Sequence, residues 1–263
     1  MSDFLVSNRL KLNDDKTHLL VLTTSQARRR AGLVLDDVVI STPVKLIHPT
    51  PSEKLLGAWV HQDLKWSEHL QYSKESLQKS LTTKLSAIKI IGRVAPFQTR
   101  KMIADGVFMS KLSYLISVWG GCEGYLISTL QTIQNNVARA VTRKAWSTPT
   151  RVLLSQCGWL SVRQLAIYHT VVLVYRVLKS GSPSYIHGMF STNYNRTTRQ
   201  SLQGLIKPSH GTQVPKTDLA ANSFRHRAVY YYNLLLADVR EAPSTIKFKR
   251  LAKKWISENT DVD

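Results

Sequence analysis

The sequence is poor in cysteine, which removes several protein classes at once. It has two cysteines, Cys122 and Cys157, and neither belongs to a CxxC pair or a Cys/His cluster. This excludes a zinc finger or knuckle and a disulfide framework, and it fits a reducing compartment. The N-terminal stretch MSDFLVSNRLKLND lacks the long apolar core of a signal peptide. We therefore expect an intracellular protein, nuclear or cytoplasmic, and not a secreted one.

Long apolar runs are also missing. The most apolar run covers residues 166–177 and is interrupted by His169 and Arg176. It is shorter than the roughly 20 residues that a membrane-spanning helix needs. The run predicts a buried helix, and we expect no membrane partner.

Acidic residues are absent from residues 124–216, although the chain as a whole contains 17 of them. The same stretch contains eleven basic residues: Arg139, Arg143, Lys144, Arg151, Arg163, Arg176, Lys179, Arg196, Arg199, Lys207 and Lys216. The formal net charge is +19 and the pI is about 10.1. A surface that merely needs to be solvated usually mixes both signs. The pattern favours nucleic acid, RNA or DNA, as the partner over a basic protein without a specific role.

Hydrophobic periodicity predicts a mostly α fold, in which a small β segment is followed by a helical bundle and a basic helical tail. Short β-rich runs cover residues 17–22, 33–35, 38–40 and 53–60. Helical spacing begins at Ser67. We predict helices over residues 67–91, 99–119, 123–144, 161–178, 219–239 and 244–257, and a mobile loop over 181–217.

Three of these helices lead to specific predictions about their faces. In the helix over 99–119 we expect these residues to point inward: Met102, Ile103, Val107, Leu112, Leu115 and Ile116. In the helix over 123–144 the buried stripe is Leu126, Leu130, Ile133, Val137 and Val141. Its other faces carry Gln131, Gln134, Asn135, Arg139, Thr142 and Arg143, which suit a phosphate backbone or, alternatively, an ordinary solvated face. The last helix is predicted to be amphipathic, with basic residues on one face. The opposite, apolar face carries Ile246, Leu251, Trp255 and Ile256.

Asp36 and Asp37 lie between two apolar runs in GLVLDDVVIS. Paired carboxylates on a hairpin hold the metal ions of nucleotide polymerases. The same dipeptide is also ordinary turn chemistry. We favour the turn, and we predict no metal or cofactor site in this chain.

Five motifs, in order, resemble the reverse transcriptases of non-LTR retrotransposons. LKLNDDKTHLLVL is similar to the family's L-x-x-N-x-x-K-T segment through Leu10, Asn13, Lys16 and Thr17. EKLLGAWVHQDLKWSEHL resembles its LG strand, the primer grip, followed by a partial D-x-x-L-x-W-x-x-H run. The thumb motifs Y-x-x-x-x-W and L-x-x-I-Q-N-x-x-A-R are matched from Tyr114 and from Leu130. GWLSVRQLAIYHTVVLVYRVLKSGSPSYI and NSFRHRAVYYYN are similar to the tail that follows.

The resemblance implies a C-terminal part of such an RNA-directed DNA polymerase. Residues 1–62 would be the end of the palm, 63–217 the helical thumb and connection, and 218–263 a basic tail. Asp36 and Asp37 follow the Asn/Lys-Thr segment, whereas the family's catalytic x-x-D-D hairpin precedes it. The chain alone is therefore expected to be inactive, although the intact family enzyme uses Mg²⁺. We also expect residues 1–62, with so few strands, to expose apolar surface.

The resemblance also suggests roles for individual residues. Lys16 would be an accessory group near the incoming triphosphate, and Leu56 and Gly57 would approach the primer end. Arg139, Arg143 and Lys144 are expected to contact phosphates. Trp119 and Trp159 lie in apolar stretches and are expected in the core. The partners would be an RNA/DNA template-primer and an upstream polymerase half. The alternatives are a non-catalytic helical nucleic-acid-binding protein derived from such an element, or a non-functional remnant.

Overall fold

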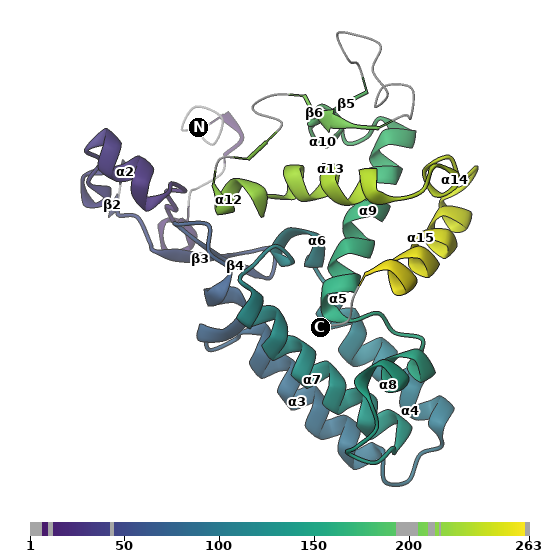
Figure 1. The fold of residues 1–263 in the computed structure, drawn as a ribbon. Coiled ribbons are helices and arrows are strands. Elements are labelled where there is room, and N and C mark those ends of the chain that lie inside the picture. The colour runs from purple at the N-terminus through teal and green to yellow at the C-terminus, as the bar shows by residue number, and fades with distance from the viewer. Residues whose placement is uncertain are drawn as a thin grey trace. The chain divides into compact units, whose positions relative to one another are not determined.

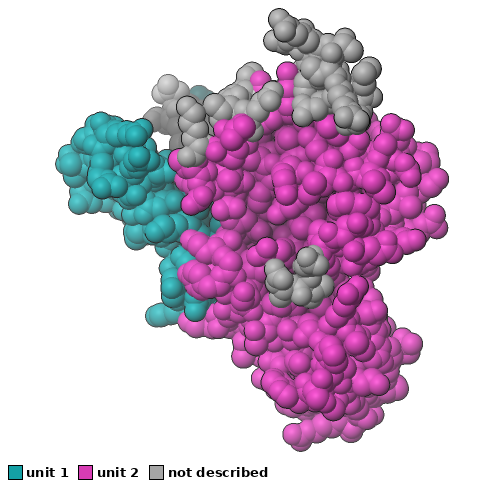
Figure 2. Space-filling view, viewed as in Figure 1, with its two compact units in different colours: residues 1–77 teal, residues 78–263 magenta. Residues whose placement is uncertain are grey.

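The computed structural model describes residues 7–9, 13–42, 45–192, 205–209, 214–215 and 217–260, and the chain divides into two compact units. Unit 1 comprises residues 1–77 and unit 2 residues 78–263 (Figure 2). The protein is 60% helix and 8% strand, with small two-stranded sheets near the N-terminus. The predicted mostly α fold with a small β segment is therefore confirmed. Leu10 and part of the predicted loop over 181–217 lie outside the described residues.

Unit 1 consists of short elements. They are η1 (Asp14–Lys16), α2 (Ser25–Ala31), η2 (Leu35–Asp37), β1 (Ile40–Ser41), β2 (Leu46–Ile47), β3 (Ser52–Leu55), β4 (Ala58–His61) and the π-helix η3 (Glu68–Tyr72). The strands form two antiparallel ribbons, β1–β2 and β3–β4. The strands predicted over 17–22 and 33–35 are wrong. Within the first of these runs Leu19 makes a single bridge to Pro49, and without a continuous partner an extended run is not a strand.

Helix α2 also departs from the prediction, which placed only strands in the first 60 residues. The hydroxyl of Thr24 accepts a hydrogen bond from the Ala27 N–H, and Gly32 ends the helix in the left-handed conformation. An N-cap and a C-terminal glycine are standard helix boundaries. Local capping signals therefore mark a helix in the segment between the β-rich runs 17–22 and 33–35.

Large apolar side chains remain exposed in unit 1, as expected for a segment with few strands. The exposed ones are Leu22, Leu33, Val34, Val39, Ile40, Leu46, Leu55, Leu56, Leu64 and Tyr72. Its buried residues include Ile47, Ala58, His69 and Leu70. A two-stranded ribbon cannot cover both of its faces, which explains the exposure.

Unit 2 is helical (Figure 1). Its first elements are α3 (Leu77–Ile91), α4 (Phe97–Ile103), the π-helix η4 (Ala104–Met109), α5 (Ser110–Ser113), α6 (Ile116–Trp119), α7 (Gly124–Thr142) and α8 (Thr150–Cys157). Then follow α9 (Val162–Ser180), α10 (Ser184–His187), β5 (Phe190–Ser191), β6 (Lys207–Pro208), α12 (Asp218–Ala221), α13 (Phe224–Leu234), α14 (Ala237–Arg240) and α15 (Thr245–Asn259). The region predicted as a loop thus contains α10 and the pair β5–β6.

Helix α9 is the central element of unit 2, as its nearly uniform apolarity predicts. It contacts α7, α13, α15 and α6. Ser161 and Gln164 form a capping box at its start. Tyr175 is buried, stacks on Phe248 of α15 with ring centroids 4.0 Å apart, and donates its hydroxyl to the Ala242 carbonyl. Each such buried aromatic contributes about 1.5–3 kcal/mol.

The helix predicted over 99–119 is interrupted. The π-helix η4 adds one residue to a turn, and Leu115 adopts a left-handed conformation at φ 55° before α6. The buried side chains are Ala104, Phe108, Leu112, Ile116 and Trp119. Met102 and Val107, predicted to point inward, are 68% and 43% exposed. The longer π turn shifts the buried stripe away from the spacing of a regular α-helix.

Gly120 and Gly121, which follow α6, are placed where no larger residue fits. A Cβ on Gly120 would lie 2.6 Å from the Ala166 Cβ of α9, and one on Gly121 would lie 2.4 Å from the Asn222 carbonyl oxygen. These glycines therefore permit close packing of α6 against α9 and of the turn after α6 against the end of α12.

The C-terminal helices are partly as predicted. The helix expected over 219–239 is divided into α12, α13 and α14, whereas that over 244–257 is α15, capped by Ser244. Its buried residues are Phe248, Ala252 and Ile256, and Ile246 is exposed rather than inward. Within the described residues, no single helix is long and apolar enough to cross a membrane, and only the bent pair α8 and α9 passes that test together.

Candidate nucleic-acid interface

Lys16 ends η1 in unit 1 and is exposed. Its backbone N–H is hydrogen-bonded to the carbonyl and the side-chain oxygen of Asn13, and the Thr17 hydroxyl donates to the same carbonyl. Asn13 therefore organises the N-x-x-K-T turn through ordinary Asx-turn chemistry. The turn presents the Lys16 ammonium to solvent.

Leu56 and Gly57 form the tip of the β3–β4 hairpin, so the prediction of one strand over 53–60 is wrong. Leu55 pairs with Ala58, and the two residues between them have φ values of 49° and 84°. Positive φ at both central residues characterises the type I′ turn, whose twist suits a two-residue hairpin. Leu56 is 81% exposed. Its side chain extends from the tip instead of lying along a strand.

Asp36 and Asp37 are exposed in the 3-10 turn η2. The expected strand before them is absent, and the strand after them begins only at Ile40. No group of three or more His, Cys, Asp or Glu side chains that could hold a metal ion occurs among the described residues. The two carboxylates thus occupy a surface turn.

Helix α7 confirms the predicted buried stripe but corrects the predicted phosphate-binding face. Gln131 and Gln134 are buried. The Gln134 amide donates to the Leu160 carbonyl at 2.9 Å, and its oxygen accepts from Gln131 at 3.0 Å. The Gln131 oxygen accepts from the Val162 N–H at 2.8 Å, which satisfies a free donor at the start of α9. These amides join α7 to the turn between α8 and α9.

Arg143, a predicted phosphate contact, directs its guanidinium to protein. It donates from Nε and Nη2 to the Gly92 carbonyl that follows α3. Arg100 is buried beside it and donates to the carbonyls of Val141 and Ala95, at 2.7 and 2.6 Å. Burial and the charge of Arg143 lower the pKa of Arg100. The two arginines connect the end of α7 to the α3–α4 connection, so Arg143 has a structural role.

Arg139 and Lys144 have different surroundings. The Arg139 guanidinium carbon lies 4.4 Å from the ring centroid of Trp146, a cation–π stack. Lys144 is exposed in the connection between α7 and α8, next to Arg143. Arg143 is exposed too, but its guanidinium is hydrogen-bonded to the Gly92 carbonyl, so Lys144 suits the predicted phosphate contact most directly.

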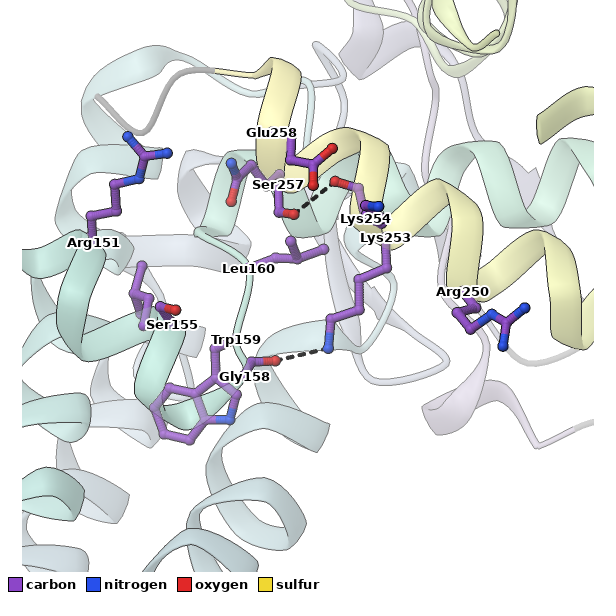
Figure 3. Close-up of a pocket in the computed structure, with 12 residues that line it drawn as sticks. Arg151, Ser155, Gly158, Trp159, Leu160, Arg250, Lys253, Lys254, Ser257 and Glu258 are labelled. Carbon is purple, nitrogen blue, oxygen red and sulfur yellow. Dashed lines mark hydrogen bonds between the residues drawn. The ribbon is translucent and has the colours of Figure 1, made fainter. Parts of the chain in front are cut away.

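A basic pocket of about 510 Å³ lies between α8, the start of α9 and α15 (Figure 3). Arg151 and Ser155 come from α8, while Arg250, Lys253 and Lys254 come from α15 on the opposite side. The wall and floor also include Leu154, Gly158, Trp159, Leu160, Gln164, Ser257 and Glu258. The lining thus includes four cationic side chains and one carboxylate, and we call this site the basic pocket.

Hydrogen bonds hold the basic pocket's walls together. Lys253 donates to the Gly158 carbonyl at 2.8 Å, and Gln164 donates to the Thr260 carbonyl at the end of α15 at 2.9 Å. The buried Trp159 donates its indole N–H to Asp105 at 2.6 Å. Trp119 is fully buried as well, so both tryptophans are in the core as predicted.

The sequence did contain a signal for the α15 side of the basic pocket. Arg250, Lys253 and Lys254 have i, i+3, i+4 spacing, which places them on one helix face. The sequence alone does not join Arg151 to them, because Arg151 precedes Arg250 by 99 positions (250 − 151). Their proximity arises because α8 leads into α9 through residues 158–161, and α15 packs against α9.

The charge of Lys249 on α15 acts on His169 of α9. Burial lowers the pKa of the His169 imidazole, and the charge of Lys249 lowers it further. The imidazole is therefore held neutral at pH 7.

No family model, no curated protein and no solved structure matches this chain.

Proposed function

We propose that unit 2 binds nucleic acid and that the chain is the C-terminal part of a non-LTR retrotransposon reverse transcriptase. Its role would be to grip an RNA/DNA template-primer. The observation that carries the binding proposal is the basic pocket, whose lining includes four cationic side chains from two helices in a chain of net charge +19. Such clusters neutralise backbone phosphates and release counterions.

The acid-free stretch supports the same proposal. It includes α7, α8 and α9 without one carboxylate side chain, and it provides Arg151 of the basic pocket and the exposed Lys144. Phosphate contacts position a protein on nucleic acid without reading its sequence. We therefore infer a binding mode that follows the backbone.

The sequence motifs support the family part of the proposal. On this proposal Lys16 would assist near a triphosphate, and the hairpin tip at Leu56 and Gly57 would approach the primer end. The carboxylates that hold Mg²⁺ would be supplied by an upstream polymerase half. This chain alone would not polymerise DNA and would need no cofactor of its own.

A second candidate is a helical nucleic-acid-binding protein that acts without a polymerase half. The core of unit 2, centred on α9, favours it, because that unit is compact by itself. The two candidates differ in one measurable respect. Only the first predicts that a polymerase half carrying an x-x-D-D hairpin increases affinity for template-primer.

Salt dependence of binding tests the proposal. The double variant Arg250→Gln/Lys254→Gln removes two basic-pocket cations, whereas Lys65→Gln/Lys89→Gln removes the same charge from exposed positions outside the pocket. We expect the slope of log K against log salt to become shallower by about 0.9 per lost duplex contact in the pocket variant. The control should keep the slope. A flat salt response of the unaltered protein would refute nucleic-acid binding, and equal slopes for both variants would remove the basic pocket from the interface.

A further inference from the structure

Trp146, in the connection between α7 and α8, is unusual among the six tryptophans, all of which the structure describes. It is 77% exposed, whereas the other five are buried or half-buried. Tryptophan has the largest side chain and normally buries most of it. Trp146 instead presents its indole to solvent beside basic residues.

Arg139 supports this indole from the protein side. Its guanidinium carbon lies 4.4 Å from the Trp146 ring centroid, and its Nε atom is buried with no hydrogen-bond partner among the described residues. The arginine rises from α7, where neighbouring residues are buried. One face of the indole is thus covered by a planar cation, and the high exposure means that the rest of the ring remains open.

The surroundings of Trp146 suit a polyanion with flat bases. Lys144 precedes it and Arg151 of the basic pocket follows it, and residues 124–216 contain no acid. Aromatic side chains in a basic groove stack successive bases of single-stranded nucleic acid, and every base has a face for stacking. A fully paired duplex has no free base face away from its ends.

We propose that Trp146 is a stacking platform for an unpaired nucleobase, with Arg139 as its positioning residue. This inference rests on the proposed function and extends it to single-stranded nucleic acid. The base stacks on the open face of the indole, and the adjoining backbone phosphates reach Arg151 and the basic pocket.

Chain geometry permits one strand to contact both sites. Arg151 lies five positions after Trp146, and five fully extended residues span at most about 18 Å. A stacked strand advances roughly 3.4 Å per nucleotide. A strand can therefore pass from the indole to the Arg151 backbone within about five nucleotides.

The test combines affinity with tryptophan fluorescence on the full chain. The probes are an oligothymidylate of about 15 nucleotides, long enough for one binding site, and a blunt duplex of the same length. Oligothymidylate should quench the emission of the unaltered protein, and Trp146→Phe should abolish most of that quenching while retaining an aromatic ring for binding. Trp146→Ala and Trp146→Leu should both weaken oligothymidylate binding by roughly 5- to 100-fold and change duplex binding little.

Leucine distinguishes stacking from apolar contact, because it keeps apolar area without a ring. Tyr185→Ala removes another exposed aromatic, 71% exposed on α10, and should leave both probes unaffected. Arg139→Lys keeps the charge but not the planar guanidinium, and it should lower the ratio of single-strand to duplex affinity. Unchanged oligothymidylate affinity in Trp146→Ala, or quenching that persists in Trp146→Phe, would overturn the platform. If neither probe binds the unaltered protein at low salt, the proposed function fails instead.

Discussion

Replacing Gln134 with alanine tests whether the polar face of α7 is structural. Gln134 is fully buried, donates to the Leu160 carbonyl and accepts from Gln131. A residue in this position was expected on a phosphate-binding face. The structure instead makes it part of the junction between α7 and the turn that joins α8 to α9.

The expected loss of stability in Gln134→Ala follows from the groups that lose a hydrogen-bond partner. The Leu160 carbonyl loses its donor, which costs about 1–3 kcal/mol for a buried group. The lost bond to Gln131 adds about 0.5–1.5 kcal/mol, although Gln131 keeps its bond to Asn135 at 2.7 Å. We expect a total loss of about 1.5–4.5 kcal/mol in the free energy of unfolding.

Urea unfolding followed by circular dichroism and by the buried tryptophans of unit 2 measures this loss. With a slope near 2 kcal/mol per molar urea, the midpoint should fall by roughly 1–2 M. Thr132→Ala is the matched control, because Thr132 is exposed on the same helix and bonds only within it, to the Ser128 carbonyl. Nucleic-acid affinity of the folded variant should not change. A loss below about 0.5 kcal/mol combined with weaker binding would refute the structural role and restore the phosphate-binding one.

Three further predictions concern other parts of the chain. Burial raises the pKa of Cys122 to about 12 and of Cys157 to about 11. Since the unfolded thiols ionise first, the free energy of unfolding should fall as pH rises from about 9 to 12, and serine at both positions should flatten that decline. Leu56→Asn should stabilise unit 1 by about 0.5–1 kcal/mol in thermal unfolding, because asparagine tolerates positive φ better than leucine; destabilisation would contradict the turn assignment. The family proposal predicts that the upstream transcript encodes an in-frame x-x-D-D hairpin a few tens of residues before Asn13. A stop codon there would leave two alternatives, a non-catalytic nucleic-acid-binding protein or a non-functional remnant.

In unit 2, hydrophobic periodicity predicts the buried residues best where the helix is a regular, uninterrupted α-helix. The stripe Leu126 to Val141 on α7 and the central helix α9 are both confirmed. The interruption at Leu115 was not predictable, because a left-handed leucine is disfavoured locally and is imposed by the packing of α6. Likewise, an alternating apolar pattern in unit 1 does not predict whether that segment pairs with another strand.

The candidate site was predicted less completely, for two physical reasons. A polar side chain on a helix can face solvent or complete a buried hydrogen-bond network, and composition alone does not distinguish Gln134 from a solvated glutamine. Arginine can bind phosphate or cap backbone carbonyls, as Arg143 does. The basic pocket depends on long-range proximity of α8 and α15, which no local pattern contains.

The basic pocket also has a consequence for the protein without a partner. Arg151, Arg250, Lys253 and Lys254 are held around one cavity and repel one another, with Glu258 as the carboxylate in its lining. This repulsion opposes the docking of α15 in the free chain and is relieved by any bound anion. If the pocket binds a multivalent anion, as proposed, folding of the C-terminal helix and occupancy of the pocket are thermodynamically linked, so each favours the other.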